Sequence, residues 1–84
     1  MDKGELKNLN VDKEVDARGT ACPGPLLEAK RAIPSVPMGG VMEVLSSDES
    51  TNSDLPLWAK KVGHEYLGTI EDAGFWRIFV RRGK

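Results

Sequence analysis

The chain is predicted to change from extended to helical within one stretch, Asp16-Ala17-Arg18-Gly19-Thr20-Ala21-Cys22-Pro23-Gly24-Pro25-Leu26-Leu27. Proline suits the first position of a helix, because it has no N–H to leave unpaired and its fixed φ already matches a helix. We therefore expect a helix that begins at Pro23, with Cys22 as its N-cap. Gly24 and Leu26 would supply the nearest backbone donors, since Pro25 has none.

Cys22 is the only cysteine of the chain. The positive end of a helix favours a thiolate, and an interaction of about 0.5–1.5 kcal/mol would lower a thiol pKa of about 8.5 by about half a unit to one unit. Arg18 would add to this effect if its side chain folded back over the sulfur. The alternative is an inert core residue, because free cysteines are among the side chains most often buried. The glycine-containing loop and the Pro-x-Pro helix start favour a nucleophile.

Length and composition predict one small domain over residues 1–84, with a loose N-terminal segment over residues 1–10, which are polar and lack periodicity. One cysteine and one histidine cannot form a disulfide or a zinc site, so we expect no metal. A single unpaired cysteine and the lack of a signal or membrane-spanning segment predict a cytoplasmic protein with no membrane association. The net charge of −1 disfavours a dedicated nucleic-acid-binding protein.

Hydrophobic periodicity predicts four strands and two helices in the order βαβαββ. The strands are expected at residues 11–17, 41–46, 64–70 and 75–82, and the helices at residues 23–36 and 53–62. The first strand, helix and strand form a βαβ unit, so the two strands should be parallel with a right-handed crossover. We therefore predict an α+β two-layer sandwich, in which both helices cover one face of a four-stranded mixed sheet that ends in a hairpin.

Reactive groups in open α/β sheets collect beyond the carboxyl ends of the parallel strands. Two loops, residues 18–22 and 46–53, leave that edge, and each leads into the N-terminus of a helix. We therefore expect four side chains in one neighbourhood, those of Arg18, Cys22, Asp48 and Asp54. The alternative roles are helix capping for Asp54 and a solvated loop carboxylate for Asp48.

Two further features have competing interpretations. His64 could serve Cys22 as a general base, but it follows the second helix at the opposite edge of the predicted fold, so a structural role is favoured and hydrolysis is not expected. The basic end of the last strand is interleaved with Phe75 and Phe79, a pattern that can bind RNA, and its cations are Arg77, Arg81, Arg82 and Lys84. A solvated face or a protein-docking surface is favoured instead because so few cations are involved, and an exposed Phe79 would favour docking.

Several motifs of the chain resemble those of the TusA/SirA sulfur-carrier family. They are Asp16-Ala-Arg-Gly-x-x-Cys-Pro-Gly-Pro-Leu-Leu, Gly40-x-x-Glu-Val, Ser53-Asp-Leu-Pro-x-Trp58, Gly63-His64-Glu65 and Phe75-Trp-Arg-Ile-Phe-Val-Arg. The resemblance extends from about Val15 to Arg82, and its most specific part is the Cys-Pro-x-Pro element with the upstream Asp-x-x-Gly. It implies a fold similar to the C-terminal domain of translation initiation factor three.

The resemblance also implies a sulfurtransferase in which Cys22 carries sulfane sulfur as a persulfide, without a cofactor. A donor protein such as a cysteine desulfurase or a rhodanese would supply the sulfur. An acceptor protein would receive it, in a relay that serves tRNA thiolation, molybdenum cofactor synthesis or sulfur metabolism. RNA would be involved only indirectly.

Supporting roles are expected around Cys22. Loop shape and support of the thiolate or persulfide would fall to Arg18, Gly19, Pro23, Gly24 and Pro25. Docking of partner proteins would involve Asp48, Asp54, Arg77, Phe79 and Arg81. Two other functions stay open, a redox-sensing module in which Cys22 is oxidised and an RNA-binding module that uses the sheet.

Overall fold

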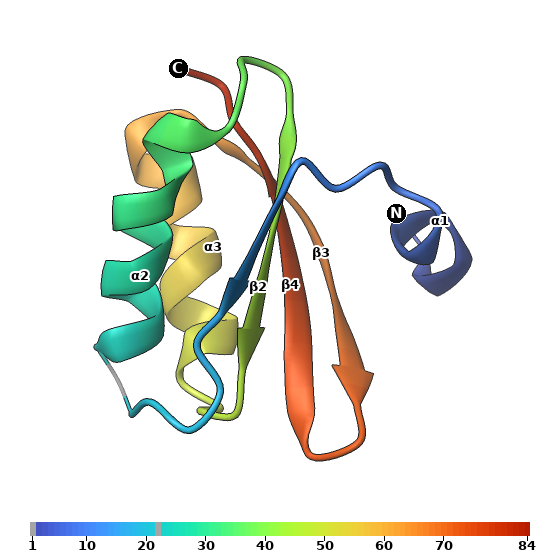
Figure 1. Cartoon of the computed structure of the whole chain (residues 1–84), viewed down its shortest axis with the longest axis vertical. Helices are drawn as coiled ribbons and strands as arrows, with labels where there is room; N and C mark the ends of the chain where they lie inside the picture. The colour runs from blue at the N-terminus through green and yellow to red at the C-terminus, as the bar shows by residue number, and fades with distance from the viewer. Residues whose placement is uncertain (1, 22) are drawn as a thin grey trace.

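The computed structural model describes residues 2–21 and 23–84 of the chain. A mixed sheet in the order β1-β2-β4-β3 has helices on both sides (Figure 1). Its strands are β1 (Lys13–Asp16), β2 (Val41–Ser46), β3 (Glu65–Asp72) and β4 (Phe75–Arg81), and the helices are α1 (Lys3–Lys7), α2 (Gly24–Ala32) and α3 (Thr51–Val62). β1 is parallel to β2, whereas β4 is antiparallel to both β2 and β3. The predicted α+β sandwich is confirmed, and α1 is an addition to it.

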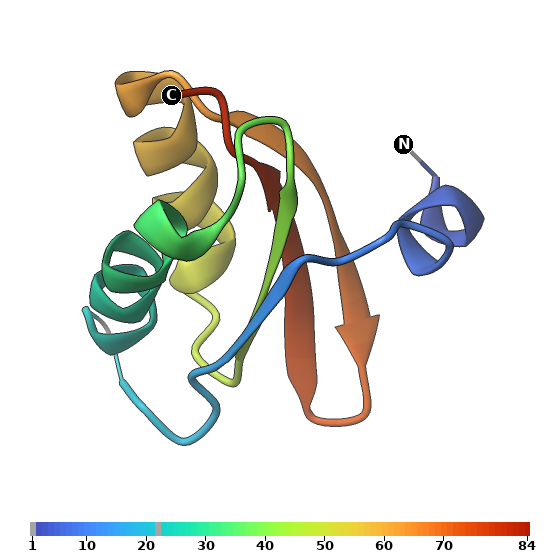
Figure 2. The ribbon, with the colours of Figure 1, turned by 45° about the horizontal axis from the view of Figure 1, so that its top comes forward.

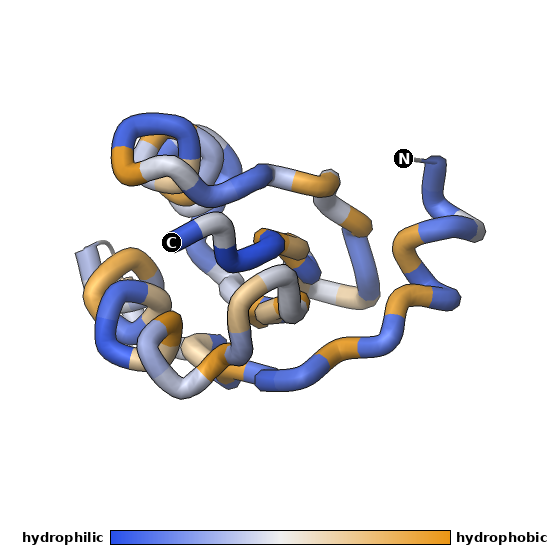
Figure 3. Tube along the Cα trace, turned by 90° about the horizontal axis from the view of Figure 1, so that it is seen from above, coloured by the Kyte–Doolittle hydropathy of each residue, from blue (hydrophilic) through white to orange (hydrophobic). Residues whose placement is uncertain are grey.

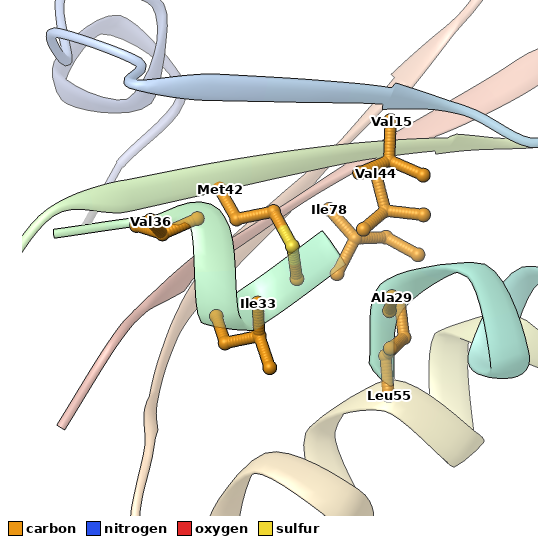
Figure 4. Close-up of a cluster of buried hydrophobic side chains, with 8 residues drawn as sticks. All are labelled: Val15, Ala29, Ile33, Val36, Met42, Val44, Leu55 and Ile78. Atoms are coloured by element: carbon orange, nitrogen blue, oxygen red, sulfur yellow. The ribbon is translucent and has the colours of Figure 1, made fainter. Parts of the chain in front are cut away.

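The larger apolar core lies between the sheet and the pair α2 and α3 (Figure 4). β-Branched and long apolar side chains from the strands meet small and branched side chains from the helices. The buried members are Val15, Ala29, Ile33, Val36, Met42, Val44, Leu55 and Ile78. Both predicted helices therefore cover one face of the sheet, as their apolar stripes at helical spacing require.

Two helix boundaries differ from the prediction. α2 ends at Ala32 and passes into a 3₁₀ turn over Ile33–Ser35, because Pro34 lacks the N–H that a longer α-helix would need. α3 begins at Thr51, earlier than the predicted start after Ser53, because a turn closed by the Thr51 N–H and the Asp48 carbonyl (3.1 Å) already starts the helix. None of the helices in residues 2–21 and 23–84 has the length and apolar character needed to cross a membrane.

The N-terminal segment is folded, so the prediction of a loose lead-in is wrong. Asp2 caps α1 by accepting the Glu5 N–H on Oδ1 (2.8 Å), and Leu6 is 3% exposed. Leu6 packs on Gly68 at an irregularity of β3, where a Cβ would lie 2.8 Å from Leu6 Cδ1. α1 thereby lies on the sheet face opposite α2 and α3 (Figure 2). A five-residue helix with one buried side chain has too little periodicity to be recognised in the sequence.

A second, smaller core forms beneath this N-terminal segment. Its buried members are Leu6, Val41, Leu67, Ile70 and Phe79. The view from above shows the helix pair, the sheet and the N-terminal segment in succession (Figure 3). Phe79 is fully buried here, so the exposure that would have favoured docking is absent at this residue. Phe79 lies on the face opposite Ile78, as the alternation of a strand requires, but alternation alone does not reveal what covers that face.

Replacing Leu6 by alanine tests how α1 is held. We expect Leu6→Ala to lower stability by about 2 kcal/mol, at the low end for a buried leucine, because undocking α1 releases chain entropy that offsets part of the loss. Hydrogen exchange should accelerate at the amides of β3 and stay slow in the strands that face α2 and α3.

The matched control is Leu57→Ala, because Leu57 lies on α3 with 67% of its surface exposed. It should leave both the stability and the exchange pattern unchanged. Equal exchange rates in β3 for Leu6→Ala and the unmodified chain would contradict the anchoring role of Leu6.

Candidate functional site

Three loops meet at one end of the molecule, residues 17–21 after β1, residues 47–50 after β2 and the β3–β4 turn at residues 73–74 (Figure 1). The Gly19 N–H donates to Ser47 Oγ at 2.8 Å and joins the first two loops. The guanidinium carbon of Arg18 lies 4.8 Å from the centroid of the Phe75 ring and joins the first loop to β4. The prediction that the first two loops lie together is therefore confirmed, but the sequence did not indicate that Ser47 and Phe75 contact the first loop.

The Arg18 side chain is held by Asp16. Nε donates to Oδ1 at 2.9 Å and Nη2 donates to Oδ2 at 2.7 Å, while the Arg18 backbone N–H also donates to Oδ1 at 3.1 Å. These charge-assisted hydrogen bonds lower the pKa of Asp16 to about 2, and they raise the pKa of Arg18. Arg18 therefore fixes the loop conformation, and the carboxylate of Asp16 compensates its charge.

The two glycines of the loop meet different steric demands. Gly19 has a φ of +81°, a left-handed conformation that other residues adopt at a cost. Gly24 lies against Thr20, and a Cβ at Gly24 would collide with Thr20 Cγ2. The Thr20 N–H donates to the Ala17 carbonyl at 3.2 Å and closes the turn. The loop is thus tied both to the end of β1 and to the first residue of α2.

α2 begins one residue later than predicted. The carbonyl of Pro23 accepts the Leu27 N–H at 3.0 Å, which makes Pro23 the N-cap and not the first helical residue. The Gly24 N–H instead closes a turn on the Ala21 carbonyl at 2.8 Å, and Pro25 is buried in the first turn. The expected N-cap role of Cys22 is therefore wrong, since Pro23 has it. Cys22 itself, with its expected nucleophilic role, lies outside the described residues.

Two open hollows flank Ser47 at this end of the molecule. The first, of about 340 Å³, is lined by Gly19, Thr20, Ala21, Ser47, Asp48 and Glu49. The second, of about 360 Å³, is lined by Ser47, Glu71, Asp72, Gly74, Phe75 and Trp76. Both have carboxylates on their rims and lie open at the surface, a shape that suits contact with another protein better than enclosure of a small molecule.

The two predicted acidic residues belong to the second loop and the helix that follows. Asp48 Oδ1 accepts the Ser50 N–H at 3.0 Å and the Ser50 hydroxyl at 2.7 Å. Asp54 lies in the first turn of α3, where a carboxylate stabilises the helix end. Beneath them the hydroxyls of Ser46 and Thr51 share a buried hydrogen bond of 2.8 Å. Asp48 thus lines the first hollow while it also orders the turn into α3.

The arginines of the last strand are paired within the sheet. Arg77 Nε lies 2.5 Å from Glu43 Oε2, whose side chain is almost fully buried, and Arg81 Nη1 lies 2.9 Å from Glu65 Oε1. Arg77 also lies over the ring of Phe79, 5.7 Å from its centroid. Such pairing compensates the charges that an RNA-binding surface would have to present. These side chains lie on the sheet face that α1 covers, and the docking role expected for them stays a prediction.

His64 lies at the other end of α3 from these loops. Its Nδ1 accepts the Gly83 N–H at 3.0 Å, and its ring centroid lies 5.3 Å from that of Trp58. Burial lowers the pKa of His64, and the positive charges of Arg82 and Lys84 lower it further. A neutral, hydrogen-bonded imidazole in this place has the structural role that the sequence favoured.

The model of the sulfurtransferase TusA family matches residues 13–82. This chain belongs to that family. A protein of Archaeoglobus fulgidus, provisionally named a sulfur carrier protein, is 50% identical over 70 residues, which cover 83% of this chain and 96% of that protein. Sulfur carrier protein TusA of Pseudomonas syringae pv. syringae is 32% identical over 77 residues, which cover 92% of each chain.

Among solved structures, the SirA-like protein of Desulfitobacterium hafniense is similar, with a TM-score of 0.68 and 29% identity. The match covers 86% of this TusA-family chain and 99% of that protein. The resemblance to the TusA/SirA family that the motifs indicated is therefore confirmed. α1 precedes the residues that the family model matches.

The Asp16–Arg18 pair can be tested by titration. Because the folded pKa of Asp16 lies below its unfolded value of 3.8, the pair stabilises the fold above pH 3.8, and this contribution is lost as the pH falls towards about 2. NMR titration should give an Asp16 midpoint near 2, and Arg18→Gln should return it towards 3.8.

The control is Arg81→Gln, which removes an exposed pair with Glu65 at the opposite end of the sheet from Asp16. It should leave the Asp16 midpoint unchanged. A midpoint near 3.8 in the unmodified chain would show that the pair does not form in solution.

The contact between Gly24 and Thr20 predicts a specific double-mutant result. Gly24→Ala should destabilise the chain by about 1–2 kcal/mol, because the added methyl group overpacks the contact with Thr20 Cγ2. Adding Thr20→Ser removes that methyl group and should restore stability to within about 0.5 kcal/mol. Denaturant unfolding measures both values. Equal stabilities of Gly24→Ala with and without Thr20→Ser would disprove the contact.

Proposed function

We propose that this chain is a sulfur carrier in which Cys22 accepts sulfane sulfur as a persulfide from a donor protein and passes it to an acceptor. The observation that carries the proposal is the Cys-Pro-Gly-Pro sequence at the head of α2, where the flanking Ala21 and Pro23 are both exposed. Membership of the sulfurtransferase TusA family and the names of relatives as sulfur carriers support it.

The reaction requires a thiolate that can attack a persulfide and later leave as a thiolate again. The Cys22 thiolate attacks the terminal sulfur of the donor persulfide, and the donor thiolate leaves with the electron pair of the broken sulfur–sulfur bond. An acceptor nucleophile then attacks the terminal sulfur of the Cys22 persulfide, and the Cys22 thiolate leaves. Such exchange is fastest when the attacking thiol has a pKa near the ambient pH. The positive end of the nine-residue helix α2 favours that range.

The surroundings of the loop suit successive contact with two proteins. The two hollows are open, and the rim formed by Asp48 with its neighbouring carboxylates favours partners that have basic residues around their own reactive cysteine. We propose a cysteine desulfurase or a rhodanese as the donor, and an enzyme of tRNA thiolation, molybdenum cofactor synthesis or sulfur metabolism as the acceptor. The relay would operate in the cytoplasm, where thiols are kept reduced.

Sulfur loading tests the proposal directly. Incubation with L-cysteine and a cysteine desulfurase should raise the intact mass of the chain by one sulfur atom, and a reductant should reverse the gain. Cys22→Ser should abolish loading while the circular dichroism spectrum and the unfolding midpoint stay unchanged.

Two results would contradict the proposal. Mass gains that correspond only to oxygen would identify Cys22 as an oxidation sensor instead. A loss of several kcal/mol of stability in Cys22→Ser would identify it as a core residue, since buried side chains respond in that way.

A further inference from the structure

Phe75 stands at the start of β4, remote in sequence from the loop that precedes Cys22. We propose that Phe75 is a positioning residue for sulfur transfer. Its ring holds the Arg18 guanidinium and so fixes the backbone that presents Cys22 to partner proteins. The inference rests on the proposed carrier function and extends it, because it assigns a role in the reaction to the β3–β4 hairpin.

The surroundings of Phe75 differ from those of its neighbours. Phe75 is only half-buried and belongs to neither of the two core clusters formed by the described residues. The next residue, Trp76, packs against the larger core, and Phe79 lies in the smaller one. An aromatic ring outside both cores contributes little to the packing of the sheet. Its contact with Arg18, at 4.8 Å from guanidinium carbon to ring centroid, therefore stands out as its specific interaction.

Arg18 is fixed from two directions. The carboxylate of Asp16 holds the edge of the guanidinium by two hydrogen bonds, of 2.9 Å and 2.7 Å. The ring of Phe75 covers the face of the guanidinium. Nearly half of the Arg18 side chain is exposed, and an exposed ion pair with Asp16 restrains a side chain only weakly. The Phe75 ring therefore connects the Arg18 side chain to β4.

The restraint continues along the backbone towards Cys22. Gly19 donates to Ser47 Oγ, the Thr20 N–H closes the turn on Ala17, and the Ala21 carbonyl accepts the Gly24 N–H. Arg18, Gly19 and Ala21 are therefore restrained by partners on other segments, and Thr20 is restrained by Ala17 within the loop. Loss of the Phe75 ring removes the contact that restrains Arg18.

A carrier whose described loops border open hollows depends on such restraints. Transfer between two proteins requires the attacking and attacked sulfur atoms to be aligned, and small misplacements of a reacting group reduce rates strongly. A small reagent in solution needs no such alignment, because it can approach the thiolate from any open side. Loss of positioning should therefore slow protein-to-protein transfer and leave the reaction with a small reagent unchanged.

The experiment compares Phe75→Leu, which keeps an apolar side chain but removes the ring, with Phe75→Tyr, which keeps the ring. A cysteine desulfurase with saturating L-cysteine loads the chain, whose concentration is varied. We expect kcat to fall about two- to fivefold in Phe75→Leu, the range for an exposed cation–π contact, with KM unchanged. Phe75→Tyr should keep the kcat of the unmodified chain. Iodoacetamide should alkylate Cys22 at the same rate in all three proteins from pH 6 to pH 9.

Results that differ from these expectations would overturn the inference in distinguishable ways. An unchanged kcat in Phe75→Leu, or a kcat in Phe75→Tyr as low as that in Phe75→Leu, would overturn the positioning role and leave the carrier function intact. Slower alkylation in proportion to the loss of kcat would also overturn it, because the thiol and not its placement would then have changed. Absence of loading in the unmodified chain would overturn the carrier function and this inference together.

Discussion

The parallel pairing of β1 with β2 is the constraint on which the site depends. Val15 pairs with Val44 and Asp16 with Leu45, and the Ala17 N–H continues the ladder by donating to the Leu45 carbonyl at 2.8 Å. Because the two strands run in the same direction, both end at the same edge of the sheet. The loops that follow must then diverge from adjacent points, which is why Gly19 can reach Ser47. An antiparallel pair would have placed the two loops at opposite ends.

The sheet has to bury both of its faces, and it does so by two different means. Apolar stripes of α2 and α3 cover one face, as helices of this kind usually do. The other face has a small apolar core under α1, together with Glu43 and Arg77, which satisfy each other where neither charge could be buried alone. This arrangement uses the arginines of β4 for the fold itself. Two cations of the last strand therefore have carboxylate partners within the sheet.

How much of the fold and of the site could be predicted from the sequence depends on how far apart along the chain the interacting residues lie. The stripes of α2 and α3 are local patterns, and the meeting of the two loops follows from the βαβ order alone. The docking of α1 depends on one leucine and on Gly68, far away along the chain, so no local pattern indicates it. The N-cap at Pro23 depends on which carbonyl accepts the first helical bond, and a proline suits either neighbouring position. Phe75 carries no local signal either, because only the folded hairpin brings it to Arg18.

The balance of charge around the loop bears on what a carrier must do. A persulfide carrier of the proposed kind has to attack in one step and to leave in the next, and the two steps make opposite demands on the same thiol. A strongly lowered pKa makes a good leaving group but a poor nucleophile, because intrinsic nucleophilicity falls as the pKa falls. A free guanidinium beside the sulfur would push the thiol towards that extreme. The bidentate pair with Asp16 compensates the charge of Arg18, so the loop would not add a free cation to the field of the α2 terminus. For a carrier of the proposed kind, an Arg18 whose charge is compensated by Asp16 would shape the loop without pushing the thiol towards that extreme.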